Sequence, residues 1–533
     1  MQTKFIFITG GVVSSLGKGL TTAAIGNLLE SRKLSIAILK LDPYLNVDPG
    51  TMNPFQHGEV YVTDDGAETD LDLGHYYRFT NSPLNKKSNA TTGQVYEAVI
   101  KKERNGEYLG KTVQVIPHVT DEIKKIIKEC SKQHEKIDVV LVEIGGTVGD
   151  IECLPFLEAI RQFRYGHPKD CINIHLTYVP YLKAAGEVKT KPSQHSAMVL
   201  RQIGIIPDII LCRSENSLSE EIKEKISLFC NVEKESVFDE KDVDKSIYEV
   251  PINLHQQGLD SHILKKLDLA INEADLSLWQ NMLDTLKSSK SEVIIGVVGK
   301  YIELKDAYKS IYEALEHAAI FNKLKLKIVQ IESDKIDDLS LLPSCDGYLV
   351  PGGFGSRGWI GKLITAKYCR ENKIPFFGVC LGLQIMAVEF ARNVIGLKNA
   401  NSVEVDKNTK YPVVSLMEDQ KRKAKLGGTM RLGSYPCTLS PKSLAFQAYN
   451  KKIIQERHRH RFEFNNEFKR EFEKHGMLFS GIFSEGGNLC EIAENKDHPW
   501  MVGVQFHPEF KSKPLAPHPL FCEFLKAAKK CQK

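Results

Sequence analysis

The sequence lacks the cysteine pairs that mark disulfide frameworks and structural zinc sites. It has 12 cysteines in 533 residues, yet no two of them form a Cys-x-x-Cys pair. Scattered cysteines of this kind are typical of reduced thiols in a cytosol. We therefore expect a cytoplasmic protein without disulfides or a structural zinc ion.

Long apolar runs are missing too. No apolar stretch approaches the ~18 residues that a membrane-spanning helix needs. At the N-terminus, residues 1–4 lead directly into a strand-like run. We therefore expect neither a transmembrane helix nor a signal peptide, and no membrane partner.

The chain has little excess charge of either sign. Its formal net charge is +4 over 533 residues, which is close to neutral. Bulk charge therefore gives no reason to expect binding to nucleic acid or to a membrane. Basic clusters at residues 421–425 and 457–461 are local exceptions. Such clusters more often bind a small anion or lie in solvent, so we expect no nucleic-acid partner.

Composition and length predict a soluble protein of more than one domain. Apolar residues make up 42% of the chain and charged residues 26%, as in globular proteins. A chain of 533 residues is too long for one ordinary core, so two or three domains are expected. We predict a first domain over residues 1–267, a linker over 268–291 and a second domain over 292–533.

The N-terminal half begins with a pattern typical of phosphate binding. An apolar run over residues 4–9 ends at Gly10 and Gly11, and a helical pattern follows from about Leu20. In this context a glycine-rich loop with Gly17-Lys18 presents backbone N–H groups to an anion. The alternative is an ordinary glycine-rich turn with an exposed lysine.

This loop departs from the standard phosphate loop at two positions. Val12 stands where the first glycine is expected, and Gly19 replaces the Ser or Thr that usually holds Mg²⁺. The missing hydroxyl predicts that any metal is held by carboxylates from elsewhere in the chain.

Candidate carboxylates occur in two places. One is an acidic run with Asp64, Asp65, Glu68, Asp70 and Asp72. Alternating acids suit a hard cation such as Mg²⁺, although a solvated acidic turn explains most of them equally well. The other is Glu143, at the end of the buried-strand pattern of residues 137–142, where ligands bind in open α/β sheets.

Two further loops of this half are candidates for ligand contact. The glycine loop of residues 145–152 directly follows the strand that ends near Glu143. The loop of residues 189–195 combines two lysines, hydroxyls and an amide, which would suit a triphosphate and a base edge. A plain surface turn has a similar composition, so both interpretations stay open.

The C-terminal half carries a pattern for thiol chemistry. Gly378-Val379-Cys380-Leu381-Gly382 follows an apolar run, which predicts a strand, a sharp turn bearing the cysteine and a helix. His507 and Glu509 follow another strand-like run and would serve as base and orienting carboxylate. The loop of residues 351–355 would help to form an oxyanion hole. Singly, such a cysteine is usually a buried small side chain and such a His-Pro-Glu a turn.

In their order along the chain, these motifs resemble those of the CTP synthase family. The resemblance extends from Lys4 to Glu509. The segments that carry it are residues 8–19, 58–60, 70–74, 143–152, 189–192, 299–301, 351–355, 380–382 and 457–461.

The resemblance implies an α/β protein of two domains. The first is an amidoligase (synthase) domain of the dethiobiotin-synthetase-like P-loop type, and the second is a class I glutamine amidotransferase domain. The implied reaction converts UTP, ATP, glutamine and water into CTP, ADP, phosphate and glutamate. In it, ATP phosphorylates the uracil 4-oxygen, and ammonia from the site of Cys380, His507 and Glu509 displaces the phosphate.

The resemblance also implies roles for individual residues. Those implied for ATP are Ser15, Leu16, Gly17, Lys18, Gly19, Leu20, Asp72, Lys241, Asp242 and Val243, with Asp72 and Glu143 holding Mg²⁺. Those implied for UTP and for CTP as product inhibitor are Ser14, Asp150, Ile151, Glu152, Lys189, Thr190, Lys191, Pro192, Ser193, Gln194 and Lys225. Those implied for glutamine are Gly353, Leu381, Gly382, Leu383, Gln384, Glu404 and Arg461, the last being one of three alternating arginines.

The family resemblance further implies a homotetramer, GTP as allosteric activator and an internal path for ammonia. Two departures from the family pattern are Ser193, where threonine is common, and Ser356, where a larger residue is frequent. Ser193 keeps a hydroxyl, so we expect no loss of function.

Two other functions share part of these residues. A different glutamine amidotransferase fused to an ATP-dependent ligase would keep Cys380 and Lys18 but change the acceptor, which makes residues 189–194 and Lys225 the discriminating feature. A structural ATPase that assembles into filaments would not need Cys380.

Overall fold

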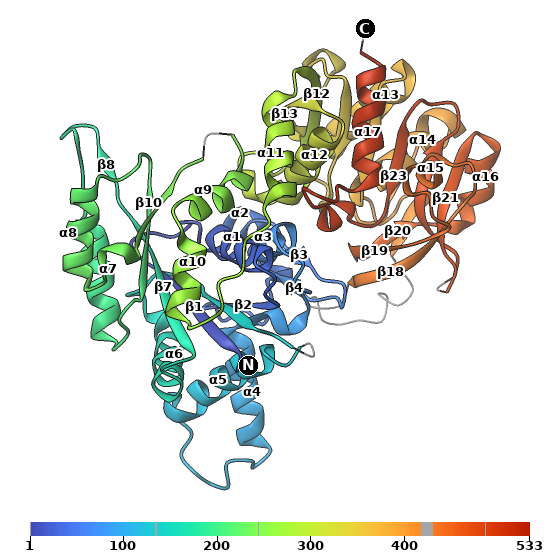
Figure 1. Cartoon of the computed structure of the whole chain (residues 1–533). Helices are drawn as coiled ribbons and strands as arrows, with labels where there is room; N and C mark the ends of the chain where they lie inside the picture. The colour runs from blue at the N-terminus through green and yellow to red at the C-terminus, as the bar shows by residue number, and fades with distance from the viewer. Residues whose placement is uncertain (1, 134–135, 244, 417–429, 486, 533) are drawn as a thin grey trace. The chain divides into compact units, whose positions relative to one another are not determined.

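The computed structural model describes residues 2–532 except 134–135, 244, 417–429 and 486 (Figure 1). The basic cluster of residues 421–425 therefore lies outside the described residues. The chain divides into two compact units. Unit 1 comprises Met1–Asp48 and Asp72–Leu283, and unit 2 comprises Pro49–Leu71 and Asp284–Lys533. The contiguous division expected from the sequence did not anticipate that the Pro49–Leu71 segment groups with the second unit.

Unit 1 is built on a seven-stranded sheet in which all strand pairs are parallel. The strands, in spatial order, are β11 (Val237–Lys241), β10 (Ile209–Ser214), β7 (Cys171–Tyr178), β1 (Lys4–Gly10), β6 (Val139–Ile144), β2 (Ile36–Asp42) and β5 (Asn89–Thr91). Most of these strands read as continuous apolar runs because helices cover both faces of a parallel sheet.

Helices connect these parallel strands, and two more follow the last of them. The connecting helices are α1 (Lys18–Ser31), α3 (Asp72–Phe79), α4 (Thr92–Arg104), α5 (Thr120–Cys130), α6 (Leu154–Gly166), α7 (Lys191–Gln202) and α8 (Glu220–Cys230), and the two that follow are α9 (Val250–Gln256) and α10 (Leu259–Lys266). A two-stranded ribbon, β8 (Tyr181–Leu182) and β9 (Glu187–Val188), precedes α7. Since β1 lies between β6 and β7, the loops after these three strands meet at one edge of the sheet, where ligands of such sheets bind.

Unit 2 contains a nine-stranded mixed sheet. Its parallel part is β13 (Leu324–Glu332), β12 (Ser291–Gly299), β14 (Gly347–Val350), β15 (Phe376–Val379) and β23 (Met501–Val504). Its antiparallel extension is β22 (Leu489–Asn495), β21 (Met477–Phe483), β18 (Arg431–Leu439) and β19 (Ile453–His460). The strands expected before Cys380 and before His507 are β15 and β23; β13 and the antiparallel extension were not predicted.

Helices cover both faces of this sheet. Phe377 and Val504 belong to one core with residues of α12 (Lys309–Phe321) and α17 (Pro519–Lys530). Phe376 and Met501, from the same strands, belong to a second core with α13 (Trp359–Asn372) and α14 (Leu381–Phe390). Smaller elements are α15 (Leu444–Tyr449), α16 (Lys469–Lys474), and a three-stranded sheet of β16 (Ala400–Ser402), β17 (Tyr411–Leu416) and β20 (Phe462–Phe464).

The chain passes from one unit to the other in two short stretches. Helix α11 (Ser277–Ser288) contains the division after Leu283. The Pro49–Leu71 segment consists of a 3-10 turn (Pro49–Thr51), α2 (Pro54–His57) and the hairpin β3 (Tyr61–Val62) and β4 (Glu68–Thr69). Within the described part of the chain, no helix combines the length and apolar character needed to cross a bilayer.

Candidate functional site

Cys380 lies at a sharp turn between β15 and α14. Its φ is 52° and its ψ is −98°, a strained conformation for a residue other than glycine. A Cβ on Gly378 would stand 2.5 Å from the Gly382 carbonyl carbon, and one on Gly382 would stand 2.3 Å from the Val350 oxygen. The two glycines therefore allow the helix to approach the strand closely enough to form the expected nucleophile elbow.

His507 and Glu509 follow β23, the parallel neighbour of the cysteine's strand. Val379 pairs with Val504, so both strands end at the same edge of the sheet. The Nδ1 of His507 lies 2.7 Å from Glu509 Oε1. The backbone N–H of His507 donates to the Arg457 carbonyl at 2.7 Å. The structure thus brings together the three residues expected to be catalytic.

Neighbouring charges set the protonation of His507. Burial alone would lower its pKa, but the charges of Glu509 and Cys380 raise the pKa of His507 to about 10. The side chain is 11% exposed, and its Nε2 has no hydrogen-bond partner among the described residues. A protonated imidazole is the partner that a reactive thiolate requires.

The glycine loop after β14 packs directly against this pair. A Cβ on Gly352 would stand 2.8 Å from His507 Cε1 and 3.6 Å from Cys380 Cβ. Further along the loop, the Gly355 N–H donates to Glu404 Oε1 at 2.7 Å. Burial raises the pKa of Glu404 although that N–H and nearby lysines oppose the shift. The loop therefore leaves open space beside the thiol.

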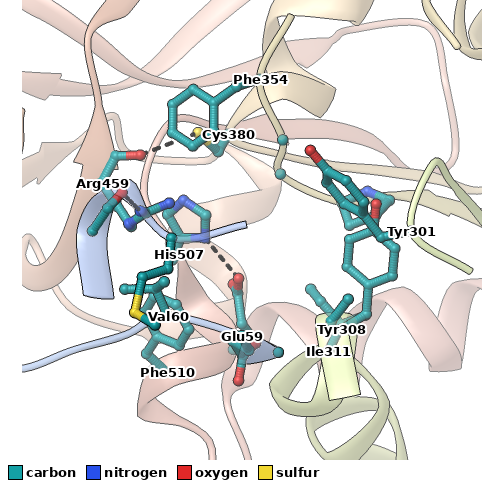
Figure 2. A pocket seen from close by; sticks show the side chains of 18 of the residues that line it. Glu59, Val60, Tyr301, Tyr308, Ile311, Phe354, Cys380, Arg459, His507 and Phe510 are labelled. Atoms are coloured by element: carbon teal, nitrogen blue, oxygen red, sulfur yellow. Dashed lines mark hydrogen bonds and ion pairs between the residues drawn. The ribbon is translucent and has the colours of Figure 1, made fainter. Parts of the chain in front are cut away.

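A cavity of about 290 Å³ opens onto Cys380 and His507 (Figure 2). Its walls include Tyr301, Tyr308, Phe354 and Arg459. The Pro49–Leu71 segment supplies a further wall, with Gly50, Thr51, Met52, Gly58, Glu59 and Val60. A partly apolar cleft of this size with a few polar groups suits a small polar substrate.

The residues predicted to bind glutamine lie around this cavity to different extents. Gly353 lines it, and Leu381, Gly382, Leu383 and Gln384 form the buried first turn of α14. Gln384 Oε1 is buried without a partner among the described residues, which leaves an acceptor for a ligand. Arg461 follows β19 and does not line the cavity, whereas Arg459 does. The roles of all of these residues stay predictions.

In unit 1, the loop between β1 and α1 is followed by a buried lysine, Lys18. Gly17 has a φ of 100° and begins α1, and Lys18 is 9% exposed. Lys18 Nζ donates to the Gly146 carbonyl at 2.7 Å. A Cβ on Gly10 would stand 2.7 Å from Lys18 Cδ, so this glycine makes room for the lysine. Burial lowers the pKa of Lys18 although Glu143 and Asp72 oppose this effect.

Asp72 occupies the space beside Gly19. A Cβ on Gly19 would stand 1.8 Å from Asp72 Oδ1, so the carboxylate needs the glycine that replaces the usual hydroxyl residue. Asp72 and Glu143 both bind Lys40 Nζ, Glu143 at 2.8 Å. Tyr76 also donates to Glu143.

Two carboxylates that converge on one cation are a donor set that fits Mg²⁺, which binds few carboxylates and completes its shell with phosphate and water. Among the described residues, no group of three or more His, Cys, Asp or Glu side chains is arranged to hold a metal.

Sequence analysis missed three residues of this region. Lys40 is 4% exposed in the otherwise apolar strand β2, and a charge in such a strand was a usable signal. Arg213 Nη1 lies 3.0 Å from the position of a Cβ on Gly17, and its Nε donates to Asp242 at 2.5 Å. His175 bonds Thr9 at 2.9 Å through Nδ1 and Ser196 at 2.8 Å through Nε2.

The residues predicted for the ATP base follow an edge strand. Lys241 ends β11, and the Asp242 N–H donates to the Ser214 carbonyl at 3.0 Å. Arg213 thus lies between this segment and the loop of Ser15, Leu16 and Gly17. This arrangement brings the two predicted ATP segments to one edge of unit 1, and their roles stay predictions.

The residues predicted for UTP and CTP gather around the start of α7. Lys191, Pro192, Ser193 and Gln194 form its first turn, and Lys189 and Thr190 precede it. Lys191 Nζ lies 5.6 Å from the ring centroid of Phe229, on the same helix as Lys225. A Cβ on Gly149 would stand 3.7 Å from Val199 on α7, which places Asp150, Ile151 and Glu152 close to this helix. Ser14 is exposed in the loop after β1.

The acidic run and the basic run of residues 457–461 contact each other. Asp64 pairs with Arg457 at 2.8 Å, and Glu68 pairs with Arg459 at 2.8 Å. Asp64 lies in an exposed turn, as a solvated acidic turn predicts, but Glu68 is buried. Within the run, Asp72 alone lies beside Glu143 and Lys40 in unit 1.

Two parts of the chain match known families. Residues 4–269 match the CTP synthase N-terminus, and residues 303–527 match the class-I glutamine amidotransferase family.

Individual relatives cover the chain almost completely. It is 65% identical over 532 residues to the CTP synthase of Protochlamydia amoebophila (strain UWE25), covering 99% of this chain and 98% of that protein. It is 58% identical over 529 residues to the CTP synthase of Chlamydia felis (strain Fe/C-56), with the same coverage. The glutaminase domain of Trypanosoma brucei CTPS with bound acivicin is 36% identical, covering 45% of this chain and 95% of that chain at a TM-score of 0.42.

Proposed function

Because the chain belongs to the CTP synthase family, we propose that it aminates UTP to CTP with ATP and with ammonia from glutamine. Membership confirms the expected family and the two-domain α/β fold, with a synthase domain followed by a class I glutamine amidotransferase domain. The observation that carries the proposal is whole-length identity of 65% together with the intact elbow at Cys380.

Unit 2 would supply the nitrogen. The Cys380 thiolate attacks the side-chain amide carbon of glutamine, and His507 donates its proton to the departing ammonia. Water then cleaves the thioester, which releases glutamate and restores the thiol. Glu509 holds the imidazole through the 2.7 Å contact to Nδ1, so that Nε2 faces the reacting groups. Gly353, Glu404, Gln384 and an arginine of β19 or its end would position the substrate.

Unit 1 would use that nitrogen. The γ-phosphoryl group of ATP passes to the uracil 4-oxygen, and ammonia then displaces phosphate from C4. The loop of Ser15 to Leu20 would hold the phosphates, with Lys18 exchanging its bond to Gly146 for a phosphate oxygen. Asp72 and Glu143 would hold Mg²⁺, which neutralises phosphate charge when bound. Lys40 already lies between these carboxylates and would balance their charge.

Selection of the pyrimidine nucleotide would rest on the region around α7. Ser14, Lys189 to Gln194 and Lys225 would contact UTP, and Asp150, Ile151 and Glu152 would favour CTP as product inhibitor. Lys241, Asp242 and Val243 would lie against the adenine. Their gathering at one edge of unit 1 supports this assignment.

Family membership also supports finer proposals. We infer a homotetramer, activation by GTP, inhibition by CTP and a cytoplasmic location. The 12 cysteines, all free thiols, suit a reducing compartment.

The acceptor can be identified directly. The full chain is incubated with ATP, Mg²⁺ and ammonium together with UTP, CTP, GTP or ITP in turn, and aminated product is separated by ion-exchange chromatography. We expect amination of UTP and none of the others. Amination of another acceptor, or ATP hydrolysis without any amination, would support the rival amidoligase or the structural ATPase.

A further inference from the structure

Two oppositely charged runs, far apart in the sequence, bind each other inside unit 2. Arg457 Nε donates to Asp64 Oδ1 at 2.8 Å, and its Nη2 donates to Oδ2 at 3.3 Å. Two residues further on, Arg459 donates to Glu68 at 2.8 Å and to the Gly50 carbonyl at 3.0 Å. Strand β19 therefore holds both ends of the Pro49–Leu71 segment.

The turn of the β3–β4 hairpin also lies directly on strand β18. The Ser434 N–H donates to the Asp64 carbonyl at 2.8 Å. A Cβ on Gly433 would stand 2.8 Å from that same oxygen, so this glycine is needed for the approach. In the middle of the segment, just before β3, the Glu59 carboxylate accepts from the Ser310 N–H at 3.2 Å and from its hydroxyl at 2.5 Å. The segment is thus fixed to unit 2 at several points.

The guanidinium of Arg457 has a second set of partners. Its Nη1 donates to the Tyr61 hydroxyl at 2.6 Å, to the Val62 carbonyl at 3.2 Å and to the Phe510 carbonyl at 3.1 Å. Tyr61 donates to the same Phe510 carbonyl at 2.8 Å. One buried arginine, 2% exposed, therefore joins the hairpin to Phe510.

Phe510 in turn lies against the imidazole of His507. The two rings are stacked, with centroids 5.1 Å apart and planes 13° apart (Figure 2). On the other side, the His507 backbone N–H donates to the Arg457 carbonyl at 2.7 Å. Arg457 therefore reaches His507 by two routes, one through its own backbone and one through Phe510.

We propose that Arg457 is a positioning residue for His507, and that through it the rate of glutamine hydrolysis depends on the Pro49–Leu71 segment. The inference rests on the proposed glutaminase role of Cys380 and His507. Loss of the contact to Asp64 or Tyr61 loosens the Phe510 carbonyl, and the stacked imidazole then loses its fixed orientation toward the thiol.

Arginine is needed here because of its geometry. Its planar guanidinium presents five N–H donors, and here it binds a carboxylate with two nitrogens and three further oxygens with the third. Lysine would keep the charge but could not make both sets of bonds at once. Burial raises the pKa of Asp64, yet Arg457 outweighs this and holds the pKa below its usual value, so the pair is charged at neutral pH.

The test uses variants of the full chain that leave Cys380, His507 and Glu509 unchanged. Asp64→Asn removes the charge that faces Arg457 at a side chain that is 55% exposed, and Tyr61→Phe removes the hydroxyl while keeping the buried ring. Circular dichroism and urea unfolding check that each variant is folded. Arg457→Lys tests the guanidinium itself. Arg470→Met, at an exposed position of α16, is the matched control.

Glutamate release, ammonia-dependent CTP formation and inactivation by 6-diazo-5-oxo-norleucine are measured for each protein. For Asp64→Asn combined with Tyr61→Phe we expect glutaminase kcat to fall about tenfold, as for a misplaced catalytic group. The KM for glutamine should change less than about twofold, and the alkaline limb of the pH profile should move to lower pH because His507 contacts Glu509 less well. Arg457→Lys should resemble the double variant.

Ammonia-dependent CTP formation should stay within about twofold of the parent, as in Arg470→Met. Unchanged glutaminase kcat and pH profile in the double variant would overturn the proposal. So would an equal loss of ammonia-dependent synthesis, since that indicates general misfolding. If the parent protein itself releases no glutamate from glutamine, the proposed function fails instead, and the two failures are thereby distinguished.

Discussion

The thiol site of unit 2 and the phosphate loop of unit 1 differ in what holds their reactive groups. At the thiol site, the backbone fixes the nucleophile, because Cys380 has a φ of 52° and lies between two glycines. His507 is held by its contact to Glu509 at 2.7 Å. At the phosphate loop, the charged side chains are paired with other groups of the protein. Lys18 binds the Gly146 carbonyl, and Lys40 binds both expected metal ligands.

This difference separates a preorganised site from one that must rearrange. The glutaminase site needs only its substrate, since the base and its orienting carboxylate are in contact. Under the proposed function, the synthase site would exchange the bonds of Lys18 and Lys40 when nucleotide and metal bind. Changes to the first site should therefore affect only glutamine use, and changes to the second should affect synthesis with either nitrogen source.

The largest effect is expected for Cys380→Ala. Glutamine-dependent CTP formation should fall by at least about 10³-fold, because the nucleophile is gone. Ammonia-dependent formation should remain within about twofold of the parent protein. CTP production is followed by absorbance with each nitrogen source, and Cys531→Ala serves as the control. Parallel loss of both activities would contradict the division between the two sites.

Removal of one carboxylate from the synthase site should have the next largest effect. Asp72→Asn or Glu143→Gln should reduce CTP formation by about 10²- to 10³-fold with either nitrogen source, because the charge opposite the phosphates is lost. Glutamate release in the absence of nucleotides should be unchanged. A titration with Mg²⁺ checks whether the residual activity requires more metal. Full synthesis in either variant would exclude that residue as a ligand.

Gly19→Ala probes the close approach of Asp72. The added Cβ would stand 1.8 Å from Asp72 Oδ1, so the carboxylate or the loop must move by more than 1 Å. Such a displacement should lower ammonia-dependent synthesis about 10²-fold. Gly166→Ala, at the end of α6 with no atom within 4 Å and no positive φ, is a control for the loss of glycine itself. The comparison is weakened if the two variants behave alike.

Glu509→Gln should change the pH dependence of glutamine hydrolysis. The Glu509 charge raises the pKa of His507, which reaches about 10, so the parent keeps a protonated imidazole through neutral and mildly alkaline pH. The variant should lose the imidazolium at a pH lower by about one unit or more, with kcat about tenfold lower at pH 8. Glutaminase rates from pH 6 to 10 measure the alkaline limb. Glu473→Gln, on the exposed face of α16, should leave it in place.

The smallest effect is expected at His175, whose ring bonds Thr9 of β1 and Ser196 of α7. Burial lowers its pKa to about 3, below the ordinary value of 6.5, so the folded protein holds it neutral. The stability that it contributes is complete above pH 6.5 and is lost as the pH falls toward 3. Between pH 7 and pH 5, the free energy of unfolding should therefore fall by about 1 to 2 kcal/mol less in His175→Gln than in the parent protein. Urea unfolding at both pH values measures this, with exposed His195→Gln as control.

Sequence patterns were sufficient where the signal is local. The strand, the cysteine turn and the helix at Gly378 to Gly382 follow from an apolar run and two glycines. Lys18 and Glu143 were likewise predicted from their positions after strand patterns. The structure brings them to one edge of a parallel sheet, as β1 and β6 pair with Ile8 opposite Glu143. Their roles remain the proposals made above.

Other features had no local signal. Arg457 and Asp64 are 393 residues apart, and neither run indicates that it binds the other. For the same reason, the Pro49–Leu71 segment could not be assigned to the second unit. Three alternating arginines gave no means of choosing between Arg459 and Arg461, because both point to the same side of a strand pattern. Lys40 differs from these, because a lysine within the mostly apolar strand β2 is itself a local signal of a buried charged site.

The placement of the Pro49–Leu71 segment has a consequence for how the protein is made. These residues leave the ribosome more than 200 residues before Asp284, where the rest of their unit begins. Their partners, including Arg457 and Phe510, come later still, so the wall that they form beside Cys380 is completed only near the end of synthesis. Contacts of such long sequence separation form slowly. Cys380, His507 and Glu509 are themselves made after the whole of unit 1, so the cavity beside the thiol combines one early segment with some of the last residues of the chain.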